Sequence, residues 1–172
     1  MNLYGRSLAS GCLAALAGLA LLSAPAQAQT YPTRSITMIV PFAAGGPTDV
    51  ISRIVTAHMA QTLGQTIIIE NVVGAGGTTA TTRASRAAND GYTLITGHMG
   101  THAASVPLYP KLAYHPETNF EPVALLAGTP ILIVAKKDFP PNNVTELADY
   151  LKANAATVNQ AQAGVGSTSF TS

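Results

Sequence analysis

Apolar residues in the first half of the chain follow two alternating patterns. Short β-branched runs occur at 35–40, 66–70 and 92–96, whereas apolar residues recur at helical spacing from Val50 to Leu63. An alanine-rich stretch at 78–88 separates the second and third runs. This pattern predicts three strands that alternate with two helices. Such an alternation indicates an α/β fold with a parallel sheet and right-handed crossovers.

Glycine clusters follow the first two predicted strands. Gly45 and Gly46 lie in the first loop, and Gly74–Gly77 follow the second run. Gly64 is placed to end the first predicted helix. Because ligands of parallel sheets bind at the carboxyl ends of the strands, these loops are the first candidates for a binding site.

The first loop also favours the start of a helix. With Gly46 as the N-cap, Pro47 takes the first helical position and Asp49 the third, from which its carboxylate can reach back to the cap amide. We expect Asp49 to be a helix cap and not a ligand contact, because its charge would repel an anion. Gly45 and Gly46 would let a ligand approach the backbone closely. A plain strand-to-helix turn explains the same residues equally well.

The pattern changes from Phe120 onward. Two apolar runs, at 123–127 and 131–135, follow each other without a helix between them, and residues 158–161 predict one more short strand. We interpret the preceding segment, 98–125, as an irregular crossing between two lobes. Its prolines at 107, 110 and 116 disfavour regular structure.

One further helix is predicted near the end of the chain. Asn143 follows a Pro-Pro-Asn sequence and can cap a helix from Val144 to about Asn154. Glu146 stands at the third helical position and completes a capping box.

The N-terminus has the pattern of a secretory signal peptide. Arg6 precedes an apolar run at 12–22, and the small residues Ala26-Gln27-Ala28 predict cleavage after Ala28. The apolar run is shorter than the roughly 20 residues that a spanning helix needs. Cys12 stands at the start of this run and not after it, which argues against a lipoprotein signal. We therefore expect export, with residues 1–28 removed.

The mature chain would be close to electrically neutral. Removing the leader takes away Arg6 and no acid, which leaves eight Lys and Arg residues against eight Asp and Glu residues. No basic block is present, which argues against nucleic acid as a partner. No cysteine would remain, so disulfide and thiol chemistry are excluded from the mature chain. The 47% hydrophobic content is sufficient for a core.

The chain ends within a segment rich in glycine and hydroxyl groups. Gly164–Ser172 has the composition of a loop that opens a helix and presents backbone N–H groups to an anion. The sequence stops before a helix can follow. We therefore expect a truncated half of a ligand-binding protein, which by itself binds poorly or folds only partly.

Motifs for catalysis and cofactors are weak. Neither glycine-rich segment has the third glycine of a dinucleotide fingerprint, so no cofactor is expected. His98 and His102 are four residues apart without a third ligand nearby, so no metal is expected. Ser167 does not lie in a G-x-S-x-G elbow. An exported hydrolase or metal enzyme that uses these three side chains is the alternative to a binding protein, and a non-functional truncated gene product is a third possibility.

Several motifs, in order along the chain, resemble one family. They are Tyr31–Ile36, Ile39–Asp49, Glu70–Asn71, Gly74–Gly77, Asp90–Leu94, Leu108–Leu112, Phe120–Val123 and Gly164–Ser167. Together they resemble the Bug-type extracytoplasmic solute receptors of tripartite tricarboxylate transporters. The resemblance implies a two-lobed periplasmic-binding-protein fold of type II, incomplete in this chain. The first part of lobe 1 would span 29–100, a crossing segment 101–122, and the start of lobe 2 residues 123–172.

The resemblance also implies a ligand cleft between three loops, Pro41–Asp49, Gly97–Thr101 and Gly164–Ser169. Backbone amides and hydroxyls there would hold a small carboxylate, a di- or tricarboxylate, for the membrane subunits of a periplasmic transport system, without chemistry. Phe170 stands where many relatives carry histidine, so one polar contact of the family would be absent. The ligand-binding residues implied are Phe42, Ala44, Gly45, Gly46, Pro47, Thr48, Gly100, Thr101, Gly166, Ser167 and Thr168.

Overall fold

The computed structural model describes residues 30–165, 167 and 169. The expected leader with its cleavage after Ala28, and the predictions made for Gly166, Thr168 and Phe170, lie outside these residues. The chain divides into two compact units, residues 1–33 and 34–172. The described part of the first unit, residues 30–33, forms neither helix nor strand. The fold described below belongs to the second unit.

A parallel three-stranded sheet forms the centre of this unit. Strands β1 (Ile36–Val40), β2 (Ile67–Asn71) and β3 (Thr93–Ile95) lie in the order β2-β1-β3. Ile36 pairs with Ile67, and Thr37 pairs with Thr93. This arrangement confirms the predicted parallel α/β sheet. Only the central strand is well buried. β2 is an edge strand with half-buried and exposed side chains.

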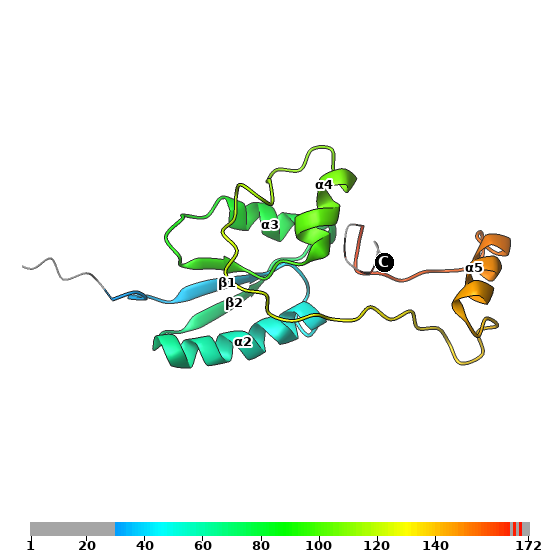
Figure 1. Cartoon of the computed structure of the whole chain (residues 1–172), viewed down its shortest axis with the longest axis horizontal. Coiled ribbons are helices and arrows are strands. Elements are labelled where there is room, and N and C mark those ends of the chain that lie inside the picture. The colour runs from blue at the N-terminus through cyan, green and yellow to red at the C-terminus, as the bar shows by residue number, and fades with distance from the viewer. Residues whose placement is uncertain (1–29, 166, 168, 170–172) are drawn as a thin grey trace, which may run out of the picture. The chain divides into compact units, whose positions relative to one another are not determined.

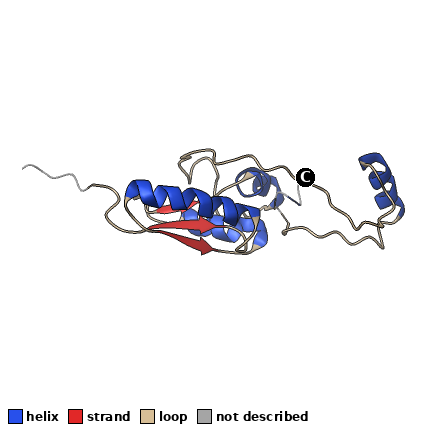
Figure 2. Ribbon diagram, turned by 90° about the horizontal axis from the view of Figure 1, so that it is seen from below, coloured by secondary structure: helices blue, strands red, loops and turns tan. Residues whose placement is uncertain are grey.

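Two helices cover opposite faces of the sheet (Figures 1 and 2). Helix α2 (Pro47–Leu63) begins after Gly46 and ends at Gly64, whose φ of 64° is left-handed, as predicted. Helix α3 (Thr78–Ser85) is shorter than predicted and follows a 3-10 turn, η1 (Ala75–Gly77). A buried hydrogen bond of 2.7 Å between Ser52 Oγ and Thr96 Oγ1 joins α2 to the end of β3.

The segment after β3 is more regular than predicted. A π-helical turn, η2 (Gly100–Ala104), continues into helix α4 (Ser105–Leu108). Pro107 is the third residue of α4 and does not interrupt it. The prediction of an irregular crossing is therefore wrong for residues 100–108. Residues 109–125 form no helix or strand, as predicted.

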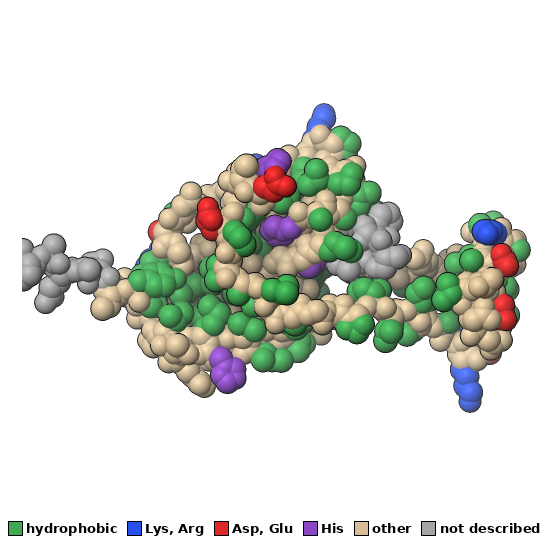
Figure 3. Space-filling view, in the orientation of Figure 1, with side chains coloured by type: hydrophobic (Ala, Val, Ile, Leu, Met, Phe, Trp, Pro, Cys, Tyr) green, Lys and Arg blue, Asp and Glu red, His purple; other side chains and the backbone are tan. Residues whose placement is uncertain are grey.

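Residues 121–138 are exposed throughout and form no regular element. Their apolar side chains include Val123, Leu125 and Val134, which are 80%, 94% and 85% exposed. The space-filling view in Figure 3 shows hydrophobic side chains, in green, on the surface of the molecule. The short strand predicted at 158–161 is absent, since those residues are irregular. No strand lies beside these segments in the described part of the chain, so the apolar pattern alone does not produce a sheet.

Helix α5 (Val144–Ala153) forms with the predicted cap. Asn143 Oδ1 accepts from the Glu146 N–H at 2.9 Å, and Glu146 Oε1 accepts from Asn143 Nδ2 at 2.7 Å. The other Glu146 oxygen accepts from the N–H of Asn142, one residue before the expected cap amide. Among the described helices, none combines the length and the apolar character needed to cross a membrane.

Candidate functional site

The loops that follow the three strands meet at Gly77. This residue has a φ of +95°, and a Cβ placed on it would lie 2.6 Å from Thr101 Cγ2 and 3.1 Å from Pro41 Cβ. The ring of Phe42 would be 3.3 Å away. Gly77 follows β2, whereas Pro41 and Phe42 follow β1 and Thr101 follows β3. The loops that follow the carboxyl ends of all three strands therefore pack against one another at this glycine. Ligands of parallel sheets bind at this end of the strands.

The first loop uses part of its backbone within the protein. Gly45 N–H donates to Asp49 Oδ2 at 2.8 Å, one residue earlier than the predicted cap amide of Gly46. Gly46 N–H donates to the carbonyl of Ala43 at 3.3 Å. Gly46 caps α2 without a side-chain hydrogen bond. A ligand at this loop would therefore meet the first turn of the helix and not the Gly45 amide, which Asp49 already occupies.

Asp49 is a buried carboxylate with three kinds of donor. Besides Gly45 N–H, Arg53 Nε donates to its Oδ2 at 2.8 Å and Asn71 Nδ2 donates to its Oδ1 at 2.9 Å. The Asp49 side chain is 2% exposed. The hydrogen bond from Arg53, then those from Gly45 and Asn71, hold the pKa of this carboxyl well below its usual range. Asp49 is therefore ionised, as expected of a cap, and it neutralises the Arg53 guanidinium.

The third loop is organised around Thr101. The buried Thr101 Oγ1 accepts from His98 N–H at 3.1 Å and lies 2.8 Å from His102 Nδ1. Gly100 N–H donates to His98 Nδ1 at 2.9 Å. Because this nitrogen is an acceptor, the proton of the neutral His98 ring lies on Nε2. The His98 ring also stacks on Phe42 with centroids 5.0 Å apart, which joins the first loop to the third.

Both histidines favour the neutral form. Burial lowers the pKa of His98, and the neighbouring His102 lowers it further. Burial likewise lowers the pKa of His102. The His102 ring packs against Gly97, where an added Cβ would lie 2.4 Å from its Cε1, and against Phe120. Within residues 30–165 and the two described serines, no group of three His, Cys, Asp or Glu side chains could hold a metal.

The segment around Gly164 contacts the same end of the sheet. A Cβ built on Gly164 would lie 3.6 Å from the backbone nitrogen of Gly76 in η1. Tyr109 Oη donates to the carbonyl of Val165 at 2.5 Å. Ser167 is 2% exposed, and its N–H donates to Gly164 O at 3.0 Å. Of the residues predicted here, the structure therefore places Ser167 beside this segment, whereas Gly166 and Thr168 lie outside the described residues.

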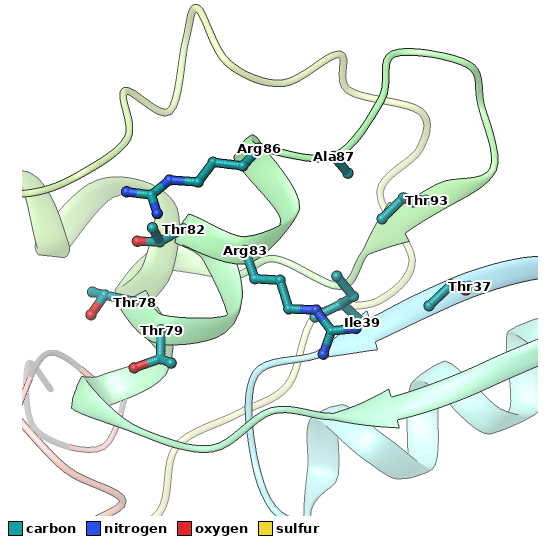
Figure 4. Close-up of a pocket in the computed structure, with 9 residues that line it drawn as sticks. All are labelled: Thr37, Ile39, Thr78, Thr79, Thr82, Arg83, Arg86, Ala87 and Thr93. Atoms are coloured by element: carbon teal, nitrogen blue, oxygen red, sulfur yellow. The ribbon is translucent and has the colours of Figure 1, made fainter.

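An open depression in the described part of the chain lies elsewhere. It measures about 810 Å³ and is found on the α3 side of the sheet (Figure 4). Arg83 extends from α3 past Ile39 and forms an ion pair with Glu70 of β2. None of the predicted site residues lines it, and its lining residues are Thr37, Ile39, Thr78, Thr79, Thr82, Arg83, Arg86, Ala87 and Thr93. The loop cluster at Gly77 is therefore the better candidate site, because it lies at the carboxyl ends of the strands.

Three residues of this cluster were not predicted as site residues. Asn71 ends β2 and binds Asp49, Gly77 is the packing centre, and Tyr109 contacts the Gly164 segment. Asn71 had a usable signal, since a polar residue directly after a β-branched run lies at the carboxyl end of a parallel strand. The contacts of Gly77 and Tyr109 join segments distant in sequence, and no local pattern indicates them.

Solved structures of periplasmic binding proteins share this fold. The structure of MatC from Rhodopseudomonas palustris with bound malate is 55% identical, with a TM-score of 0.77 over 80% of this chain and 47% of that one. The periplasmic binding protein BugD is 44% identical, with a TM-score of 0.70 over 82% of this chain and 47% of that one. A further R. palustris protein, solved with adipate, is 34% identical, with a TM-score of 0.73 over 80% of this chain and 46% of that one.

The sequence comparisons agree with the fold. A family model described as tripartite tricarboxylate transporter family receptor matches residues 51–171, and the chain belongs to this family. A UPF0065 protein of Agrobacterium vitis is 41% identical over 91% of this chain and 45% of its own length. BugT of Bordetella pertussis is 33% identical over 97% of this chain and 51% of its own length. The chain thus spans about half the length of the curated relatives it matches.

Proposed function

We propose that this chain is part of a periplasmic receptor that binds a small carboxylate, a di- or tricarboxylate, for a tripartite transporter. The observation that carries the proposal is the 55% identity to a protein solved with malate, together with a TM-score of 0.77. The related protein solved with adipate supports the same ligand class. Export with cleavage after Ala28, the division into lobes at 101–122, and the transporter's membrane subunits as partners belong to this proposal.

The ligand would lie at the loop cluster around Gly77. The first turn of α2 offers backbone N–H groups and the hydroxyl of Thr48, since Gly46 caps the helix without a side chain. Thr101 and Ser167 are buried hydroxyl residues of the other two loops. Arg53 is neutralised by Asp49, so the ligand would be held by amides and hydroxyls and not by a free cation. The other residues assigned to the site are Phe42, Ala44, Gly45, Pro47, Gly100, Gly166 and Thr168.

A thermal-shift titration of the chain tests this proposal. Because a chain that spans about half the length of its relatives is expected to bind weakly, malate and adipate are raised to millimolar concentration. We expect each to increase the melting temperature in a saturable manner, and acetate at equal concentration to do much less. Ligand recovered unchanged after incubation would support a receptor. Conversion of the ligand, or no shift with any di- or tricarboxylate, would contradict it.

A matched pair of threonines on α2 localises the site. Thr48→Val removes a hydroxyl at the start of the helix, and we expect the affinity for malate to fall about two- to tenfold, as for one lost hydrogen bond. Thr62→Val is the control, because Thr62 lies in the last turn and its Oγ1 donates to His58 O at 3.1 Å. Equal effects of the two substitutions would argue against a ligand at the first loop.

A further inference from the structure

Asn71 joins three elements at the end of β2. Its Nδ2 donates to the Phe42 carbonyl at 2.9 Å and to Asp49 Oδ1 at 2.9 Å. Its Oδ1 accepts from Arg53 Nη2 at 3.3 Å. The side chain thus connects the second strand to the loop after the first strand and to helix α2.

The partners of Asn71 determine the orientation of its amide. A carbonyl and a carboxylate can only accept hydrogen bonds, and a guanidinium can only donate them. A rotated amide would place its oxygen against the Phe42 carbonyl and the Asp49 carboxylate. Aspartate at this position would place two carboxylates together, and leucine would fill the space without any hydrogen bond. The site therefore requires the amide of asparagine and not merely a side chain of this size.

We propose that Asn71, Asp49 and Arg53 form a clasp that positions the ligand loop Phe42–Gly46. The loop is held at two points, since Asn71 binds the Phe42 carbonyl and Asp49 binds the Gly45 N–H. The ring of Phe42 in turn stacks on His98, so the clasp also sets the contact between the first and third loops. The three residues are positioning residues. Their role in binding rests on the proposed function, whereas their role in holding the loop does not.

Asp49 acts in this clasp as a built-in anion. Gly45 N–H, Arg53 Nε and Asn71 Nδ2 converge on one carboxylate that is almost fully buried. Because these donors are already satisfied, a ligand carboxylate does not compete for them. Truncating Asp49 to alanine would leave the three donors around a space of carboxylate size. Formate should occupy that space and restore the loop.

Hydrogen exchange of the Gly45 amide, followed by NMR in the full chain, tests the clasp directly. In Asn71→Leu we expect this amide to exchange about tenfold faster, and the dissociation constant for malate to rise by a similar factor. Glu70→Gln is the matched control, since the side chain of the neighbouring Glu70 pairs with Arg83 on α3. It should leave both measurements unchanged.

A second pair of variants keeps the test decisive if Asn71→Leu does not fold. Arg53→Met removes the guanidinium from a side chain that is 51% exposed, so the fold should tolerate it. Asp49→Ala should lose protection at Gly45 and regain it with added formate. Unchanged Gly45 exchange in the folded variants, or no response to formate, would overturn the clasp. If the unaltered chain does not bind malate, the proposed function fails, and Gly45 exchange alone then decides whether the clasp exists.

Discussion

The two parts of the described chain before and after Phe120 differ in how their apolar residues are used. In the first part, Ile36, Ile39 and Val40 of β1 are at most 2% exposed between α2 and α3. In the second part, Leu132 and Ile133 are 76% and 75% exposed. Both parts contain β-branched apolar runs, yet only the first forms strands. The difference shows that such a run becomes a strand only where other strands and covering helices are present.

Helix α5 extends this comparison, because it forms in the second part without a buried residue. Its stabilising contacts are local: Asn142, Asn143 and Glu146 form the cap, and the Tyr150 ring packs on Phe139 just before the helix. A capped helix satisfies its backbone within one segment, whereas a strand must pair with another segment. Local sequence signals are therefore sufficient for α5 and insufficient for the apolar runs at 123–127 and 131–135.

The largest expected effect is a loss of core packing in the first part. Ile36→Ala removes a fully buried side chain of β1 and should lower the free energy of unfolding by about 2–5 kcal/mol. Leu132→Ala should change it by less than about 0.5 kcal/mol, since Leu132 is exposed. Urea unfolding followed by circular dichroism measures both. A large effect of Leu132→Ala would show that the second part has a core of its own.

The same contrast explains how much of the fold could be predicted. Periodicity and glycine positions predicted the parallel sheet and α2 with both of its ends, because these signals are local. The turn η2 could not be predicted, since its carbonyl at Thr101 and the hydroxyl of Ser105 are bound by Tyr114 Oη, a contact made after the chain returns. The half-buried state of β2 depends on its place at the sheet edge, which sequence order does not determine.

A second effect concerns the close packing at the candidate site. Gly77→Ala should cost about 1–2 kcal/mol for a left-handed backbone and a further 1–3 kcal/mol for contact with Thr101 and Pro41. Gly45→Ala is the control, since Gly45 has a φ of +85° and no atom within 4 Å of an added Cβ. Only the backbone cost should appear there. Thermal unfolding of the two variants compares them, and equal losses would show that the three loops do not pack at Gly77.

The candidate site was predictable in position but not in its internal contacts. The glycine loops and the rule that ligands bind at the carboxyl ends of strands indicated the end of the sheet where the three loops pack at Gly77. The sequence also indicated that Asp49 caps α2. It did not indicate that Asp49 would occupy the Gly45 amide, because the turn geometry at Gly45 and the position of Asn71 arise only from the packing of β2 beside β1. The assignment of ligand contacts stays a prediction.

A smaller effect is expected from acid. The folded state holds His98 and His102 at lowered pKa values, so it binds fewer protons than the unfolded state. Stability should therefore be constant above about pH 7 and should fall as the pH drops below about 6.5, the ordinary pKa of histidine. His102→Gln should flatten this slope, and the exposed His58→Gln of α2 should not. Melting temperatures between pH 5 and 8 give the comparison, and a slope unchanged by His102→Gln would contradict it.

The smallest effect on the sheet should come from the α5 cap. Asn143→Ala removes the acceptor of the Glu146 N–H and should destabilise α5 by about 1 kcal/mol. Because α5 has no buried residue, this loss should appear as reduced helicity of 144–153 and not as a lower midpoint for the sheet. Backbone NMR shifts of α5 and of β1, read in the same sample, separate the two outcomes. If β1 loosened together with α5, the two parts would unfold as one cooperative unit, and the contrast between local and paired structure would not hold for this chain.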